Sequence, residues 1–172
     1  VLSSNLDMTG TLDHLGELPF LRVFKVANCS GLQGSLVDLS LCPLLTVLDL
    51  HGCCNLEGSL EPLTNCLNLK ELDMHSCSKL VGTLEPLGPC SKLRKLNLAG
   101  CNGIKGPLPG NILRLITSKS IDLTNCEGPF RIAPSINQIQ EINALDLSML
   151  GPRLYGSLNA FSELTALETL NL

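Results

Sequence analysis

The sequence contains few aromatic residues and few charged residues. Among 172 residues there is no tryptophan, one tyrosine and four phenylalanines, and only 16% of the residues are charged. Proteins that bind nucleic acids use aromatic side chains to stack bases and many cationic contacts to phosphate. Here Phe24 and Phe161 fall at expected core positions. The clearest row of cations has only four members, all close to carboxylates: Arg22, Lys70, Arg94 and Lys119. We therefore expect no nucleic-acid partner.

Long apolar runs and catalytic motifs are also missing. Polar residues separate the leucines throughout, so no stretch approaches the roughly 20 consecutive apolar residues of a membrane-spanning helix, and we expect no membrane insertion by this segment. The sequence has no phosphate-binding loop, nucleophile elbow or zinc-protease helix, and the repeat places no serine or cysteine nucleophile beside its three histidines. We therefore expect a protein that is not an enzyme and that uses no cofactor.

The sequence does contain a tandem repeat. Four strings of one form, LRVFKVANC, LTVLDLHGC, LKELDMHSC and LRKLNLAGC, begin 24 residues apart at Leu21, Leu45, Leu69 and Leu93. We call this string the strand motif, and related strand motifs begin at Ser118, Ile142 and Leu167. A second string, close to L-x-G-x-L, brings six glycines into one column: Gly10, Gly34, Gly58, Gly82, Gly106 and Gly156. A fixed period with L-x-x-L-x-L-x-x-N/C at its start is typical of stacked repeats.

This pattern resembles the leucine-rich repeat family over almost the whole chain, and the L-x-G-x-L element resembles its plant-type subclass. The resemblance implies an α/β-type solenoid that is mostly β, a right-handed superhelix with a parallel sheet on its concave side. Prolines in the segments between strand motifs favour turns and 3₁₀ pieces on the convex side over full helices. We expect residues 1–172 to be a single domain, a fragment of about seven repeats without caps at either end.

Alternation within each strand motif predicts which side chains face the core. Successive side chains in a strand point to opposite faces, so Leu48 and Leu50 should point inward while Val47, Asp49 and His51 point outward. The same alternation predicts one inner column, formed by the equivalent residue of five strand motifs: Leu48, Leu72, Leu96, Ile121 and Leu145.

The outward residues of the strand motifs are the candidate binding surface. The family resemblance implies that the concave sheet recognises a protein or peptide partner, and we expect these residues to contact it: Lys25, Asp49, His51, Glu71, Asp73, His75, Lys95, Asn97, Asp122 and Asp146. The middle column of this face is mostly acidic, so we expect a partner with basic or polar side chains. The alternative is an architectural or self-associating segment of a receptor-like or cell-surface protein.

The repeat is irregular at NCEGPFRIAPSI, which begins at Asn125, and at MLGPRLYG, which begins at Met149. Functional sites often break local rules, although drift in a surface turn has the same effect on a sequence. These segments place Arg131, Arg153 and Tyr155 where they could share one flank, and arginine and tyrosine are favoured at interfaces. We take this flank as a second candidate contact patch.

Eight of the nine cysteines occupy two repeat columns, and the ninth, Cys54, lies outside both. One column stands at the N/C position and the other at a small apolar position: Cys29, Cys53, Cys77, Cys101 and Cys126, then Cys42, Cys66 and Cys90. Stacked strands hold equivalent residues about 4.8 Å apart, whereas a disulfide needs Cβ atoms about 3.8 Å apart. We therefore expect buried reduced thiols, which slightly favour the cytoplasm, although the plant-type resemblance leaves an extracellular ectodomain open.

A zinc site shared by the histidines and the cysteine columns is not expected, because the histidines face outward and the thiols turn inward. A narrower possibility is a patch two strands wide, formed by Asp49, His51, Asp73 and His75, that holds a metal or responds to pH. The alternative is that these side chains are simply solvated. We expect no metal site.

Overall fold

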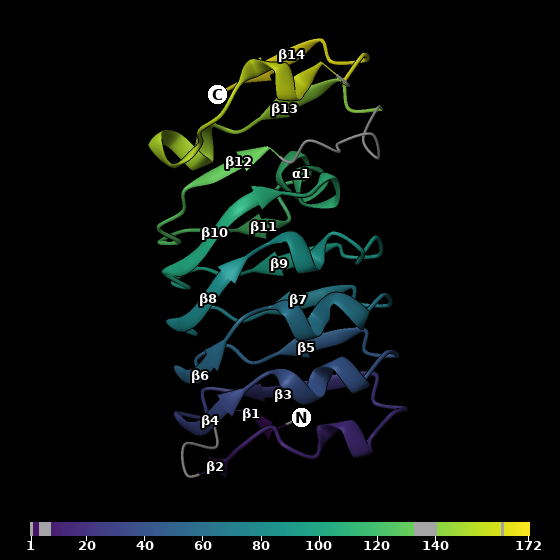
Figure 1. The fold of residues 1–172 in the computed structure, drawn as a ribbon, viewed down its shortest axis with the longest axis vertical. Coiled ribbons are helices and arrows are strands. Elements are labelled where there is room, and N and C mark those ends of the chain that lie inside the picture. The colour runs from purple at the N-terminus through teal and green to yellow at the C-terminus, as the bar shows by residue number, and fades with distance from the viewer. Residues whose placement is uncertain (1, 4–7, 133–140, 163) are drawn as a thin grey trace.

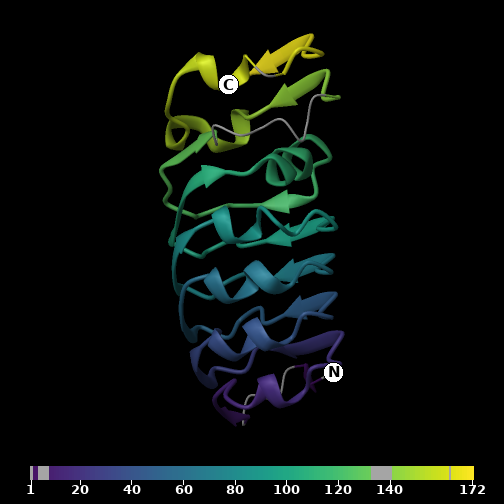
Figure 2. The same ribbon diagram turned by 45° about the vertical axis from the view of Figure 1, so that its right-hand side comes forward.

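The computed structural model describes residues 2–3, 8–132, 141–162 and 164–172, which form a stack of similar turns along one long axis (Figure 1). A regular turn holds a strand from the strand motif, a second strand from the L-x-G-x-L string and a 3₁₀ segment that leads to the next strand motif (Figure 2). The two sets of strands lie on opposite sides of the stack. This is a mostly β solenoid, and it confirms the fold expected from the repeat.

The strand motifs form a parallel six-stranded sheet in the described part of the chain, which we call the front sheet. Its strands, in their spatial order, are β1 (Leu2–Ser3), β3 (Val23–Ala27), β5 (Val47–Asp49), β7 (Glu71–Asp73), β9 (Lys95–Asn97) and β11 (Ile121–Asp122). The register pairs Leu48 with Leu72 and Leu72 with Leu96. Equivalent side chains of successive repeats therefore stack on one another.

The inward column of the strand motifs is confirmed within the front sheet, with one position less covered than the others, whereas Leu145 is buried but lies outside that sheet. Leu48, Leu72, Leu96 and Leu145 are buried. Ile121 is only partly buried, because β11 is the last strand of the front sheet and no described strand pairs with its outer edge.

The L-x-G-x-L strings form a second parallel sheet, where the sequence led us to expect turns. We call it the return sheet, and its strands are β2 (Thr9–Gly10), β4 (Gly31–Ser35), β6 (Asn55–Gly58), β8 (Lys79–Thr83), β10 (Gly103–Leu108) and β12 (Phe130–Ile132). Copies at a constant period bring equivalent backbones side by side, so their peptide groups can pair. The core lies between the two sheets, where Leu48 and Leu56 of one turn are both fully buried.

We call each segment between two successive strand motifs a return. Most returns contain 3₁₀ segments, as expected: η1 (Leu15–Glu17), η2 (Val37–Leu41), η3 (Glu61–Asn65) and η4 (Glu85–Leu87). The expectation of no full helix is wrong at one return, where α1 (Gly110–Thr117) is an α-helix. Pro109 precedes this helix instead of interrupting it, and Ile112, Leu113 and Ile116 are buried at helical spacing. These residues let the segment complete two helical turns.

The last strand motifs do not extend the front sheet. Strands β13 (Ala144–Asp146) and β14 (Thr169–Asn171) pair with each other as a separate parallel sheet, accompanied by η6 (Ser148–Arg153) and η7 (Leu158–Phe161). Helix α1 packs against β13. Asp146 therefore pairs with Asn171 and does not continue the column that ends at Asp122. The expectation of one uninterrupted sheet is wrong at this end of the chain.

Candidate functional site

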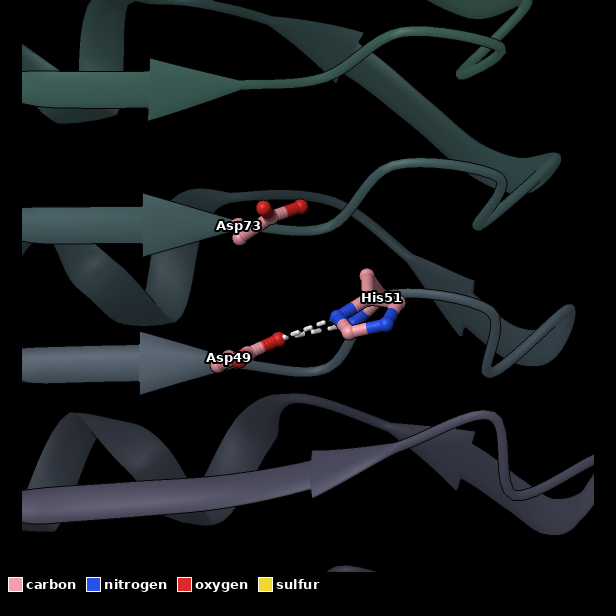
Figure 3. Close-up of side chains that lie close together, drawn as sticks. All are labelled: Asp49, His51 and Asp73. Carbon is pink, nitrogen blue, oxygen red and sulfur yellow. Dashed lines mark hydrogen bonds and ion pairs between the residues drawn. The ribbon is translucent and has the colours of Figure 1, made fainter. Parts of the chain in front are cut away.

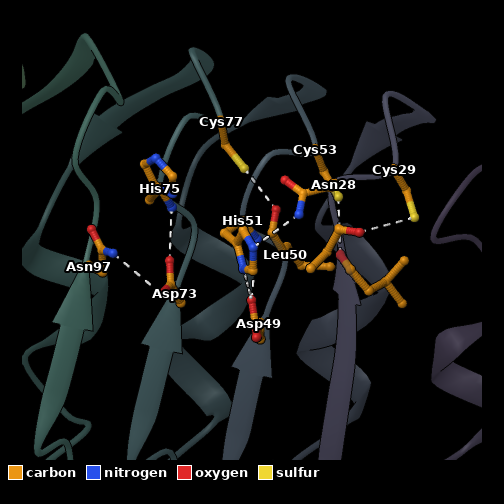
Figure 4. Close-up of polar contacts among 12 residues, drawn as sticks. Asn28, Cys29, Asp49, Leu50, His51, Cys53, Asp73, His75, Cys77 and Asn97 are labelled. Atoms are coloured by element: carbon orange, nitrogen blue, oxygen red, sulfur yellow. Dashed lines mark hydrogen bonds and ion pairs between the residues drawn. The ribbon is translucent and has the colours of Figure 1, made fainter. Parts of the chain in front are cut away.

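The outward face of the front sheet carries one column of mostly acidic residues in strict register. The strand pairing sets Lys25 beside Asp49, Asp49 beside Asp73, Asp73 beside Asn97, and Asn97 beside Asp122. Figure 4 shows the central part of this column, with each side chain on its own strand. The sequence predicted this alignment, because it follows from the repeat length alone.

The acidic column also has a structural role that the sequence did not reveal. Asp73 Oδ1 accepts a hydrogen bond from the backbone N–H of His75 at 3.1 Å, two residues further along the chain. Asn97 accepts from Ala99 at 3.1 Å, and the same local bond recurs in the strand motifs that follow. Such bonds hold the chain as it turns out of the strand. The signal that could have indicated this role is the recurrence of Asp or Asn at one position of the strand motif.

These carboxylates reach the surface without a lysine or arginine partner in the described part of the chain, with Asp49 and Asp73 partly exposed and Asp122 exposed. Among the described residues, the ion pairs within 4.0 Å are two histidine contacts, His14 with Glu17 and His51 with Asp49. Glu71 and Lys95 are neighbours in register without forming such a pair. Side-chain and backbone hydrogen bonds from Thr124 lower the pKa of Asp122. Within the described residues no lysine or arginine pairs with a carboxylate of the column, and its three carboxylates outnumber its one lysine, Lys25, so the column carries a net negative charge.

A histidine cluster occupies the same face beside β5 and β7. His51 Nδ1 lies 2.7 Å from Asp49 Oδ1, and the Asn28 amide nitrogen lies 3.3 Å from His51 Nε2. The His75 ring stacks on the His51 ring with centroids 6.0 Å apart. Figure 3 shows Asp73 on the neighbouring strand beside Asp49 and His51. The structure thus brings together the four side chains that the sequence placed in one patch.

The second candidate patch, formed by Arg131, Arg153 and Tyr155, is built differently from the face of the front sheet. The Arg153 guanidinium donates to the carbonyl oxygens of Leu123 at 2.9 Å and Cys126 at 2.8 Å, so it is engaged within the protein. Arg131 and Tyr155 line a cavity of about 300 Å³ near the C-terminal end. Tyr155 is 50% exposed. Of the three residues expected to share this flank, two line the cavity and the third braces the backbone.

The cysteine columns belong to the core. None of the nine cysteines forms a disulfide, and all are buried except the half-buried Cys54. In the N/C column four of the five thiols reach back to the strand motif of the preceding repeat, and Cys77 Sγ donates to the Leu50 carbonyl oxygen at 3.2 Å (Figure 4). Burial raises the pKa of Cys101 to about 12. The Cys101 thiol is therefore protonated at neutral pH, and the thiols of this column lie in the core, away from the histidine cluster.

In the described part of the chain, no helix has the length and apolar character needed to cross a membrane.

Solved structures of leucine-rich repeat ectodomains are similar to this chain. The ectodomain of the receptor kinase SOBIR1 from Arabidopsis thaliana is 27% identical, with a TM-score of 0.64, over 78% of this chain and 72% of that one. The ectodomain of the Arabidopsis thaliana receptor kinase GASSHO1/SCHENGEN3, solved in complex with CASPARIAN STRIP INTEGRITY FACTOR 2, is 25% identical with a TM-score of 0.54. That match covers 92% of this chain but 19% of the other.

A plant ice-binding protein has the same fold. It superposes with a TM-score of 0.65 at 20% identity, over 100% of this chain and 63% of its own. This chain thus spans less than two thirds of both the ice-binding protein and the GASSHO1/SCHENGEN3 ectodomain. No protein-family model and no curated protein sequence matches the chain.

Proposed function

This chain is a leucine-rich repeat protein, and from that premise we propose that it is a non-catalytic binding module whose front sheet recognises a protein or peptide partner with basic or polar side chains. The observation that carries the proposal is the in-register column from Lys25 to Asp122. Its carboxylates have no lysine or arginine partner within 4.0 Å among the described residues. A basic partner would supply the missing counter-charges.

The similar proteins support a binding role. The GASSHO1/SCHENGEN3 ectodomain was solved in complex with CASPARIAN STRIP INTEGRITY FACTOR 2, and the SOBIR1 structure is the ectodomain of a receptor kinase. The shared property of such solenoids is an extended surface formed by repeated strands, and this surface suits an extended partner.

The geometry of the column favours many weak contacts over one strong contact. Asp73 uses Oδ1 to hold its own turn, which leaves Oδ2 to the Asn97 amide and to a partner. An exposed ion pair contributes only about 0 to 1 kcal/mol, so affinity must add up over several strands. Association should weaken as salt is added, because the attraction acts over exposed charges.

The proposal is tested with a fluorescently labelled peptide of alternating lysine and serine, and with a matched peptide in which glutamine replaces lysine. Anisotropy measures binding to the protein and to the double variant Asp49→Asn, Asp73→Asn. Asparagine removes the charge but keeps the local hydrogen bond, as Asn97 does in the next strand motif. We expect the double variant to raise the Kd for the lysine peptide about fivefold to thirtyfold, which corresponds to 1 to 2 kcal/mol.

The matched control is the double variant Glu57→Gln, Glu61→Gln. Glu57 lies on the return sheet and Glu61 begins η3, both are exposed, and the change in net charge is the same. We expect little loss of binding. Equal losses from both double variants would indicate attraction to overall charge and would contradict a site on the front sheet. If only Arg131→Gln or Tyr155→Phe weakened binding, the cavity on the flank would replace the front sheet as the candidate.

A further inference from the structure

We propose that Asp49, His51 and Asp73 form a binding site for a divalent transition-metal ion, with Zn²⁺ as the best fit. One ligand atom from each residue lies within 4.8 Å of the others. A metal site here would not require a protein or peptide partner, so it is tested independently of the proposed binding function. It revises our expectation, drawn from the sequence, that the chain has no metal site.

The fold places the three ligands from two neighbouring strands. Strand pairing fixes Asp49 beside Asp73, and His51 follows Asp49 by two residues on the same face (Figure 3). Tetrahedral zinc with oxygen and nitrogen ligands at about 2.0 to 2.2 Å needs roughly 3.4 Å between ligand atoms. None of the three side chains is packed in the core, so rotation about their side-chain bonds can close the remaining distance.

The electrostatics of the cluster favour a cation. Two carboxylates in register on adjacent strands repel each other, and no lysine or arginine lies within 4.0 Å of either among the described residues. His51 is 31% exposed and Asp49 is 23% exposed at the side chain, so their charges are only partly screened by water. An imidazole beside two carboxylates suits zinc, nickel or copper better than calcium or magnesium, which prefer sets of oxygen ligands.

Neighbouring residues fit a metal at His51 Nδ1. Coordination there requires the proton to be on Nε2, which then needs an acceptor. Asn28 is in place, with its amide nitrogen 3.3 Å from Nε2, and a flip of that amide would present its oxygen instead. Water can complete the coordination, because the three ligands are only partly buried, and the His75 ring stacks beside His51 at the edge of the cluster (Figure 4). After that flip Asn28 would orient His51, so the site has three ligands and one neighbour able to hold the imidazole.

The site is tested by titrating the chelator-treated full chain with Zn²⁺ in an isothermal calorimeter, without any peptide. We expect one ion per chain. His51→Gln and Asp73→Asn should each weaken the affinity for Zn²⁺ at least about tenfold. Removing a residue that only orients a metal ligand already costs about that much, and removing the ligand itself should cost no less. Calcium should not compete, and the urea midpoint of each variant shows whether it still folds.

Two control variants separate this site from other zinc ligands. His14 and Glu17 form a similar pair, 3.0 Å apart, without a third ligand in the candidate cluster, so His14→Gln should leave the affinity unchanged. Cys54 is the half-buried thiol, so Cys54→Ser tests binding at sulfur. Absence of binding at 1 mM Zn²⁺, loss of binding in Cys54→Ser, or equal affinities for the parent chain, His51→Gln and Asp73→Asn would each overturn the proposal.

Discussion

At the scale of single residues, one side chain performs the same task in turn after turn. The thiols of Cys77 and Cys101 donate to backbone carbonyl oxygens of the preceding strand motif, at 3.2 Å and 3.1 Å. Each thiol therefore fills apolar space and satisfies a buried acceptor at the same time. The second column of buried thiols does the same for carbonyl oxygens of the preceding 3₁₀ segment, as Cys66 does for Leu39 at 3.5 Å.

The buried thiols predict a loss of stability at alkaline pH. Burial raises the pKa of Cys66 to about 12 and that of Cys90 to about 11, from 9.0. Above pH 9 the unfolded chain releases these protons while the folded chain retains them, so the free energy of unfolding falls as pH rises toward the folded pKa values. Between pH 9 and its folded pKa, each such thiol lowers the free energy of unfolding by up to about 1.4 kcal/mol per pH unit.

Urea unfolding at pH 8 and at pH 10.5, under reducing conditions, measures this effect. We expect a clearly lower midpoint at pH 10.5, and a smaller decrease in Cys90→Ala than in the parent chain. A midpoint independent of pH would contradict the assignment of these thiols to the core.

The sequence predicted the direction of side chains better than their hydrogen bonds. Alternation was sufficient to place Leu48 inside and Asp49 outside, because a strand allows only two faces. The bond from the His75 N–H to Asp73 depends on how the backbone turns after the strand. The contacts of Arg153 depend on a carbonyl 30 residues away in the chain. Neither is visible in a pattern of residue types.

At the scale of elements, the returns show where periodicity fails as a guide. The return strands contain glycines with positive φ, such as Gly82 at 104°, a conformation that other residues rarely adopt. This glycine column was visible in the sequence, but it was interpreted as a set of turns. Parallel pairing between returns depends on equal spacing of neighbouring repeats, which a single repeat does not reveal. Helix α1 likewise depends on the position of Pro109 at its start.

Arg153 links two irregular elements, and its removal should be costly. Its guanidinium donates to Leu123 and Cys126 after β11, and to Met149 in η6 at 2.8 Å. We expect Arg153→Met to lower the free energy of unfolding by about 2 to 4 kcal/mol, because several buried or partly buried carbonyl groups lose a charged donor. Thermal or urea unfolding measures the change.

The matched control for this prediction is Arg131→Met. Arg131 lies on β12, is partly exposed and makes no side-chain hydrogen bonds of this kind to the described residues. Its substitution should change stability by less than about 1 kcal/mol. Equal effects from the two variants would show that Arg153 does not brace these elements.

At the scale of the whole molecule, stacking of the repeats creates two long surfaces that differ in chemistry. The front sheet presents the acidic column with the histidine cluster, while the return sheet presents Glu57 beside Lys79 in register. Both sheets place opposite charges side by side, as with Lys25 beside Asp49 on the front sheet, but in the described register two carboxylates, Asp49 and Asp73, align on the front sheet alone. This difference between the two faces is the physical basis for assigning partner recognition to the front sheet.

The most direct measurement of that assignment is an NMR titration of the isotope-labelled chain with the lysine and serine peptide. We expect the amide signals of Asp49, Asp73 and Asn97 to shift with increasing peptide, and the shifts to disappear at high salt. Signals of Glu57 and Lys79 on the opposite face should stay in place. Shifts confined to the return sheet, or spread evenly over both sheets, would contradict recognition by the front sheet.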